Sequence, residues 1–233
     1  MQISVVIPAF NEEKVIKDTL DEVLDFLKNN FQNFELIVVN DASRDKTATI
    51  VSQIPGVILL NNQKNHGKGY SVAKGVNFAQ GDLILFMDAD NSTRIKELKN
   101  FLPFISKYSV IIASRAMSQA NVIKRQAAWK VFFGRIGNWL IQLFLLPGIK
   151  DTQCGFKLFR KECKNLFRQL KIEDWGFDFE FLFLAKKNKF LIKELGVVWE
   201  NNLDSKVKFS TYFKTLWQVL TVRYNYLFNK YKV

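Results

Sequence analysis

Residues 83–90 read LILFMDAD, a short apolar run that ends in two aspartates separated by one alanine. A continuous apolar run of this length is typical of a strand that is buried on both faces. The two carboxylates at its end, Asp88 and Asp90, can hold one hard divalent cation such as Mg²⁺ or Mn²⁺ through oxygen ligands. An ordinary acidic turn is the alternative interpretation of so short a pattern.

Outward from this stretch, strands and helices are predicted to alternate along the first 94 residues. Strands are expected at residues 3–9, 35–40 and 57–61, and helices after Asn11, at 47–53 and at about 70–79. Asn11 is expected to cap the first helix, with Glu12 in its first turn. The short links between these elements predict a mostly parallel sheet with helices on both faces.

The pattern changes beyond residue 95. We expect a helix at about 95–106, a strand at 110–114, a compact polar segment at 151–160, helices near 161–170 and 177–188, and a strand at 190–199. Residues 124–146 and the tail at 209–231 combine basic groups with large apolar groups at helical spacing.

Net charge is unevenly distributed along the 233 residues. Residues 1–116 hold 13 basic and 13 acidic side chains, whereas residues 117–233 hold 21 and 9, so the excess of +12 lies in the second half. Such an excess indicates an anionic partner, which could be nucleic acid, phosphate groups or a membrane surface; a solvated face is the alternative. The basic residues match no nucleic-acid motif, and nucleic acid is not expected as a partner.

Several function classes are excluded by composition. Two cysteines at an unsuitable spacing rule out a disulfide scaffold or a zinc site of known pattern, and one histidine rules out a multi-histidine metal centre. No uncharged stretch is long enough to span a bilayer, and no signal peptide is visible. We therefore expect a cytoplasmic protein that associates with a membrane at most peripherally.

Polar residues follow three of the predicted strands. These are Asn11 and Glu12, Asp41 and Ser43, and Asp88 and Asp90. Each could serve as a helix cap or a turn residue, but ligands of open parallel sheets bind at the carboxyl ends of the strands, so together they indicate a site. A metal held there would clamp a diphosphate leaving group. Lys68, between Gly67 and Gly69, could reach the phosphates or could lie in a plain loop.

Six motifs in order resemble glycosyltransferase family 2, which has the type A glycosyltransferase fold. They are VVIPAFNEE (5–13), VVNDASRDKT (38–47), NHGKGYSVAKG (65–75), DADNST (88–93), SR (114–115) and DTQCGFKLF (151–159). With WGFDFEFL (175–182) and DSK (204–206), the likeness is greatest to the subgroup that glucosylates dolichyl or polyprenyl phosphate. The family usually has glycine at two positions that are Ala42 and Asp204 in this chain.

The resemblance implies a role for each matching residue. The nucleotide-sugar site would comprise Pro8, Ala9, Asn11, Glu12, Asp41, Lys68, Asp88 and Ala89, with Asp41 reading the base and Asp88 and Asp90 binding Mg²⁺ or Mn²⁺. Asp178, Asp90 and Arg115 would be catalytic, Asp178 or Glu180 lying near the anomeric carbon; a helix cap is the alternative for Asp178. Arg125, Gln153 and Lys206 would bind the acceptor phosphate.

One α/β domain of this type is expected over residues 1–208. Its nucleotide-sugar and metal-binding half would be 1–94 and its acceptor-binding half 95–208, followed by an amphipathic segment at 209–233. Residues 124–149 and this tail suit helices at an anionic membrane interface, or else ordinary core helices.

The expected activity is an inverting transfer of a hexose onto a polyprenyl or dolichyl phosphate. UDP-glucose is the expected donor, and a lipid phosphate, already ionised at pH 7, needs cations more than a general base. Two alternatives remain: a family 2 enzyme acting on a saccharide acceptor in surface polysaccharide synthesis, and a non-enzymatic nucleotide-sugar or membrane-binding module.

Overall fold

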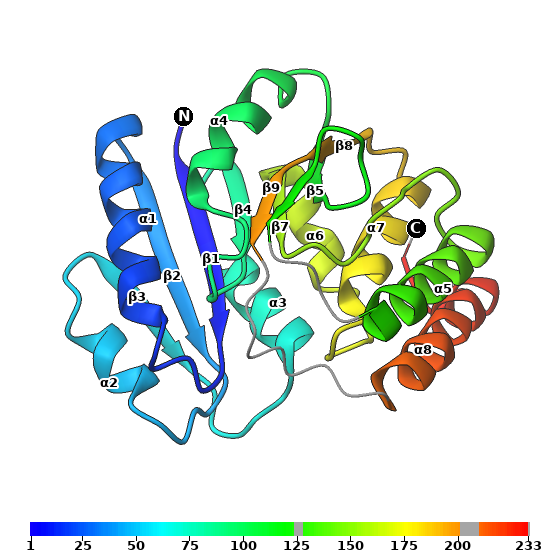
Figure 1. Cartoon of the computed structure of the whole chain (residues 1–233), viewed down its shortest axis with the longest axis horizontal. Helices are drawn as coiled ribbons and strands as arrows, with labels where there is room; N and C mark the ends of the chain where they lie inside the picture. Colours follow the sequence, from blue (N-terminus) through cyan, green and yellow to red (C-terminus); the bar gives the residue numbers. More distant parts are fainter. Residues whose placement is uncertain (124–127, 201–209, 233) are drawn as a thin grey trace.

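A computed structural model describes residues 1–123, 128–200 and 210–232 (Figure 1). Within these ranges, one sheet has seven strands in the order β3-β2-β1-β4-β7-β5-β8, and β6 pairs with β9 in a second, small sheet. The strands are β1 (Ile3–Ala9), β2 (Phe34–Asn40), β3 (Val57–Asn61), β4 (Leu83–Met87), β5 (Val110–Ser114), β6 (Asn121–Ile123), β7 (Phe156–Arg160), β8 (Ile192–Gly196) and β9 (Val198–Glu200).

The helices of these ranges connect and cover the strands. They are α1 (Ile16–Asn30), α2 (Thr47–Ser52), α3 (Lys68–Phe78), α4 (Leu98–Phe101), α5 (Ala128–Phe144), α6 (Lys164–Phe167), α7 (Phe177–Lys187) and α8 (Ser210–Leu227), with 3₁₀ turns at Ile95–Glu97, Leu102–Phe104 and Lys161–Cys163. The prediction of an α/β fold with a mostly parallel sheet and C-terminal helices is confirmed.

Strand β7 is the antiparallel member of the large sheet. It lies between β4 and β5 and runs against both, with Met87 opposite Phe156 and Val110 opposite Phe159. The prediction of a compact polar segment at 151–160 was therefore wrong for its second half. The sequence FKLFR contains two charges, and Lys157 is buried within the sheet despite its charge.

Alternate residues of the strands face two separate cores. Val5, Ile7 and Leu85 pack under α1, α2 and α4, whereas Val6 and Phe86 pack under α3, α6 and α7. Because helices cover both faces of the sheet, every residue of a central strand is buried, and the strands are therefore apolar throughout. The parallel strands β1, β2 and β4 thus hold their carboxyl ends at one fixed edge.

Several elements differ from the sequence-based expectation, three of them most clearly. Helix α1 begins at Ile16, because Asn11 adopts a left-handed φ of 55° and cannot serve as its cap. The expected helix at 95–106 is broken into α4 and two 3₁₀ turns, and the second turn contains Pro103. The expected strand at 190–199 is divided into β8 and the start of β9.

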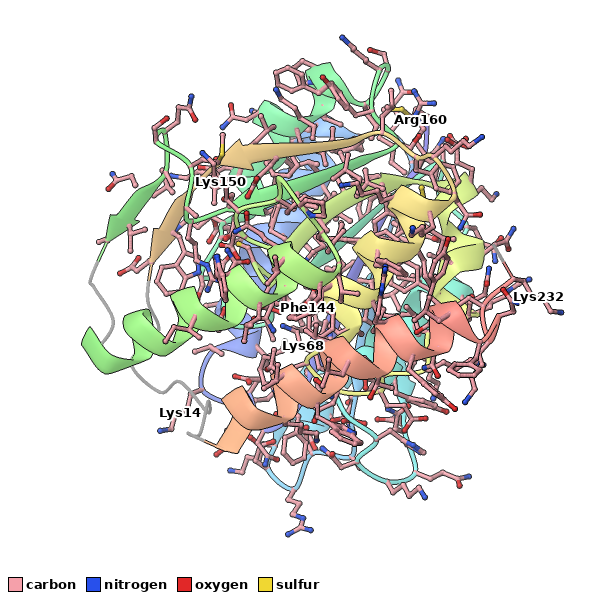
Figure 2. All side chains as sticks on the ribbon, turned by 90° about the vertical axis from the view of Figure 1, so that its right-hand side faces the viewer. Lys14, Lys68, Phe144, Lys150, Arg160 and Lys232 are labelled. Carbon is pink, nitrogen blue, oxygen red and sulfur yellow. The ribbon has the colours of Figure 1, made fainter. Side chains whose placement is uncertain are left out.

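Helices α5 and α8 pack side by side at one end of the molecule (Figures 1 and 2). Val219 and Val222 of α8 and Ile141 of α5 are buried in the same core as the α7 phenylalanines. Residues 210–232 are thus packed onto the domain. None of the helices that the structure describes is both long and apolar enough to cross a bilayer.

Candidate functional site

The two aspartates of the DAD motif lie at the carboxyl end of β4, in the middle of the sheet. The amide of Asp88 donates to the carbonyl of Gly155 at 3.0 Å. From the opposite side, the hydroxyl of Thr19 on α1 donates to the carbonyl of Ala89 at 2.8 Å. The backbone of the motif is therefore fixed by hydrogen bonds to two other segments of the chain.

Lys68, the first residue of α3, brings a cation to this motif. Its Nζ lies 2.7 Å from Oδ1 of Asp88 and 4.8 Å from the centre of the Trp175 ring. Burial disfavours the charge of Lys68, but the carboxylates of Asp88 and Asp178 outweigh burial and raise its pKa. Lys68 is therefore held charged beside Asp88, and its predicted contact with phosphates stays a prediction.

Asp90 is partly buried beside Asp88. Burial first, and then the negative charge of Asp88, raise the pKa of Asp90, while the amide of Ser92 donates to its Oδ1 at 3.0 Å. Two carboxylates that repel each other in this way are stabilised by a shared cation.

The donor set fits a divalent cation that is shared with a ligand. In the described part of the chain, no group of three or more His, Cys, Asp and Glu side chains forms a metal site. Mg²⁺ is commonly held by one or two carboxylates, with phosphates and waters completing its shell. Asp88 and Asp90 would supply the protein ligands, and a diphosphate would supply the rest.

Asp41 at the end of β2 fixes the loop that leads into α3. Its Oδ1 accepts from Asn62 at 2.7 Å and from the amide of His66 at 3.0 Å, and its Oδ2 accepts from the amide of Gly67 at 2.8 Å. Asp41 is buried, and these bonds place Lys68 at its position beside the DAD motif. Its predicted contact with a base stays a prediction.

The loops that follow β1 and β2 are joined to each other. The backbone amide of Asn11 donates to Ser43 Oγ at 3.0 Å, and the side-chain oxygen of Asn11 accepts from the amide of Arg44 at 2.8 Å. The amide of Glu12 donates to Thr47 Oγ1 at 2.8 Å. The loops after β1 and β2 thus lie at the same edge of the sheet, as predicted. Pro8 and Ala9, the last residues of β1, lie at this edge as well.

Ala42 stands where the family usually has glycine, and it adopts a left-handed backbone conformation. Its φ is 56°, in the left-handed region that is strained for residues with a Cβ. The alanine in this turn therefore carries backbone strain that glycine would not.

Arg115, at the end of β5, is bound to Asp151. Its Nε and Nη2 lie 2.7 and 2.9 Å from the two carboxylate oxygens, and its amide donates to the same group at 2.9 Å. Burial lowers the pKa of Arg115, but Asp151 more than reverses that effect; conversely, Arg115 outweighs burial and lowers the pKa of Asp151. This pair fixes the 151–154 turn, in which the amide of Gln153 donates to Asp151 at 3.3 Å.

Asp178 and Glu180 face different surroundings within α7. Asp178 is buried and forms an ion pair with Lys157, and burial raises its pKa although both Lys157 and Lys68 oppose that shift. Glu180 accepts from the amides of Lys171 and Ile172 and from the hydroxyl of Tyr231. Glu180 thus holds a loop and the C-terminal segment, and Asp178 is the one whose charge acts on Lys68.

Two predicted acceptor-binding residues, Arg125 and Lys206, lie outside the described residues. Conversely, sequence reasoning assigned no role to Lys157, Asp151 or Trp175, which contact Asp178, Arg115 and Lys68. The position of Lys157 between Phe156 and Leu158 in a run of strand-forming residues was the one signal that could have marked it as buried.

The comparison with protein families matches residues 4–167 to the model of glycosyl transferase family 2. This chain belongs to that family. The predicted resemblance is confirmed, and so is the expectation that the chain is a glycosyltransferase.

Relatives of this family 2 chain are similar over nearly its whole length. A dolichyl-phosphate beta-glucosyltransferase of Trichomonas vaginalis is 34% identical over 97% of this chain and 74% of its own length. The human dolichyl-phosphate beta-glucosyltransferase is 31% identical over 97% of this chain and 76% of its own.

Solved structures of the same fold include two phosphoglycerate glycosyltransferases. Mannosyl-3-phosphoglycerate synthase of Rubrobacter xylanophilus superposes with a TM-score of 0.73 at 16% identity, over 100% of this chain and 76% of that one. Glucosyl-3-phosphoglycerate synthase of Mycobacterium tuberculosis, solved with Mn²⁺, UDP and phosphoglyceric acid, gives 0.71 at 17% identity, over 98% and 78%.

Proposed function

We propose that this family 2 enzyme transfers glucose from UDP-glucose onto dolichyl or another polyprenyl phosphate, with inversion at the anomeric carbon. The observation that carries the proposal is the similarity, over 97% of the chain, to relatives named dolichyl-phosphate beta-glucosyltransferases. The arrangement of Lys68, Asp88 and Asp90 supports it, because it suits a nucleoside diphosphate.

The donor would lie across the carboxyl ends of β1, β2 and β4. Its diphosphate would approach Lys68, whose charge Asp88 and Asp178 maintain. Mg²⁺ or Mn²⁺ at Asp88 and Asp90 would neutralise charge on the departing UDP. Trp175, whose ring centre lies 4.8 Å from the Lys68 Nζ, would limit the access of water to the phosphates.

The reaction would be a single in-line displacement. An oxygen of the acceptor phosphate attacks the anomeric carbon, the bond from that carbon to the UDP oxygen breaks, and UDP leaves with the electron pair. Because the acceptor oxygen is already ionised, Asp178 need not remove a proton from it. The burial of Asp178 against Lys157 agrees with a role other than that of a base.

A lipid acceptor calls for a membrane-facing surface, and α5 and α8 offer one. Trp139, Leu143, Trp217, Leu227 and Phe228 expose about 60% or more of their surface. The sequences of the two helices contain no acidic residue, and Lys214 and Arg223 of α8 are exposed. Exposed aromatic and apolar groups with basic neighbours are typical of helices that lie in an anionic lipid interface.

This surface adjoins the candidate site. Lys214 of α8 forms an ion pair with Asp174, which is next to Trp175, and Gln218 lies against Gly176. A phosphate at the membrane surface would thus meet the enzyme close to Lys68. We propose that the α5–α8 face binds the membrane peripherally.

The test is a transfer assay with Mg²⁺ or Mn²⁺ and dolichyl phosphate in detergent. UDP-glucose, UDP-GlcNAc, UDP-galactose and GDP-mannose, each radiolabelled in the sugar, would be compared in parallel. Label in the organic phase from UDP-glucose is the expected result. Label in the organic phase from another donor would show that the transferred sugar is not glucose. Label found only in added oligosaccharide would show that the acceptor is a saccharide and not a lipid phosphate.

A further inference from the structure

Lys157 is a charged residue in the centre of the sheet. It is 1% exposed, and its Nζ donates to the carbonyl of Cys154 at 2.7 Å and to the carboxylate of Asp178. The ring of Phe86 lies 5.6 Å from the ammonium group. A buried ion pair of this kind recovers its cost of desolvation only with good geometry and added hydrogen bonds, so it is weak as a source of stability.

The pair continues into the DAD motif through alternating charges. Asp178 forms an ion pair with Lys157, and the ammonium groups of Lys157 and Lys68 lie 5.6 and 5.3 Å from the centre of the same Phe86 ring. The charge of Asp178 therefore also acts on Lys68, whose Nζ is 2.7 Å from Asp88. Lys68 is therefore shared by a carboxylate that would bind the metal and one that would not.

We propose that Lys157 and Asp178 form a positioning pair that sets how strongly Lys68 holds Asp88, and thereby how tightly Asp88 and Asp90 bind a divalent cation. The inference rests on the proposed metal-dependent donor site, on which the two residues would act through Lys68. Neither residue of the pair would touch the metal or the donor.

The two members of the pair have opposite effects on Lys68. With Lys157 replaced by an apolar residue, the buried Asp178 carboxylate would draw Lys68 toward itself and release Asp88. With Asp178 replaced by a neutral amide, Lys68 would be left with the carboxylates of the DAD motif, Asp88 first and then Asp90, and would hold them more strongly. Metal affinity should therefore rise in the first variant and fall in the second.

The experiment is a titration of the purified full chain with MnCl₂, in which the EPR signal of free aqueous Mn²⁺ reports binding. Relative to the wild type, Lys157→Met should bind Mn²⁺ about tenfold more tightly and Asp178→Asn about tenfold more weakly. The double variant, which removes both charges, should lie within about threefold of the wild type. Lys17→Met, on the exposed face of α1, is the matched control and should change nothing.

A second set of variants tests whether Lys68 carries the effect. In a Lys68→Met background, each shift should shrink at least threefold, because the shared cation is gone. Unchanged shifts in that background, or shifts of the same sign for both single variants, would overturn the inference. Thermal unfolding of each variant identifies a purely structural loss, since misfolding weakens Mn²⁺ binding whichever charge is removed.

The failure of the underlying site would look different. If the wild-type chain binds no Mn²⁺, the proposed metal site fails and this inference fails with it. If the wild type binds Mn²⁺ in an Asp90-dependent manner and the pair has no opposing effects, only the inference fails.

Discussion

The backbone of Gly155 lies directly against the carboxylate of Asp88. The Asp88 amide donates to the Gly155 carbonyl at 3.0 Å, and a Cβ on Gly155 would overlap the carboxylate atoms. Strand β7, which follows Gly155, thus runs antiparallel beside β4 and closes one side of the DAD motif. The family-like sequence DTQCGFKLF (151–159) therefore requires glycine at this position because of contact with the site.

Gly155→Ala should displace the Asp88 carboxylate and lower kcat/KM for transfer about 100-fold, since misplacing a reacting group by about 1 Å has an effect of that size. Gly137→Ala in α5 is the matched control, because a Cβ there meets nothing within 4 Å. The control should keep full activity and gain up to about 1 kcal/mol in stability. Equal activity of the two variants would contradict the described contact.

Asp90→Asn should abolish transfer and stabilise the metal-free protein. Burial and Asp88 raise the pKa of Asp90, so the native state binds its proton more tightly than the unfolded chain does. The stability from that proton is present at low pH and is lost as pH rises through the raised pKa.

At pH 7 in EDTA, removing the Asp90 charge should therefore raise Tm by about 2–4 °C. The gain should disappear in acid, where Asp90 of the wild type is protonated. Scanning calorimetry at both pH values measures this; a lower Tm for Asp90→Asn at pH 7 would refute the described desolvation.

Ala42→Gly should stabilise the protein by about 1 kcal/mol, because glycine adopts the left-handed φ of 56° without strain. Ala48→Gly, within α2, is the matched control and should destabilise by about 0.5–1 kcal/mol. Urea unfolding of the two variants gives both values. Destabilisation by both would show that the turn at Ala42 has another conformation.

Trp139→Ser and Trp217→Ser should each weaken binding to vesicles of phosphatidylglycerol and phosphatidylcholine about tenfold, since each removes a large exposed apolar group from the α5–α8 face. Leu191→Ser removes a side chain of comparable exposure, 55%, that belongs to neither helix, and should have no effect. Co-sedimentation at low and high salt measures the binding. Equal losses of vesicle binding in all three variants would show that the α5–α8 face is not the membrane-binding surface.

Much of the nucleotide half could be predicted from sequence, because its strands are apolar runs with polar residues at their ends. Asp41, Lys68, Asp88 and Asp90 do gather at one edge of the sheet. Buried parallel strands make this pattern readable, since every strand end delivers its next residue to the same place.

The second half was less predictable, because its organisation depends on pairs that are distant in sequence. Lys157 can lie inside β7 because Asp178, on another element, neutralises it. Likewise, Arg115 is engaged by Asp151, a partner that neither composition nor spacing identified. Local sequence patterns therefore identify these residues as charged but do not show that they form ion pairs with distant partners.

The most direct test of the account compares wild-type protein and Asp90→Ala in one assay of glucose transfer from UDP-[¹⁴C]glucose to dolichyl phosphate. We expect label in the organic phase with Mn²⁺ for the wild type, none with EDTA, and none for Asp90→Ala, although that variant unfolds cooperatively. Transfer that persists without metal or without Asp90 would contradict the proposed site. Metal-dependent UDP binding by the wild type without any labelled lipid would contradict the proposed acceptor.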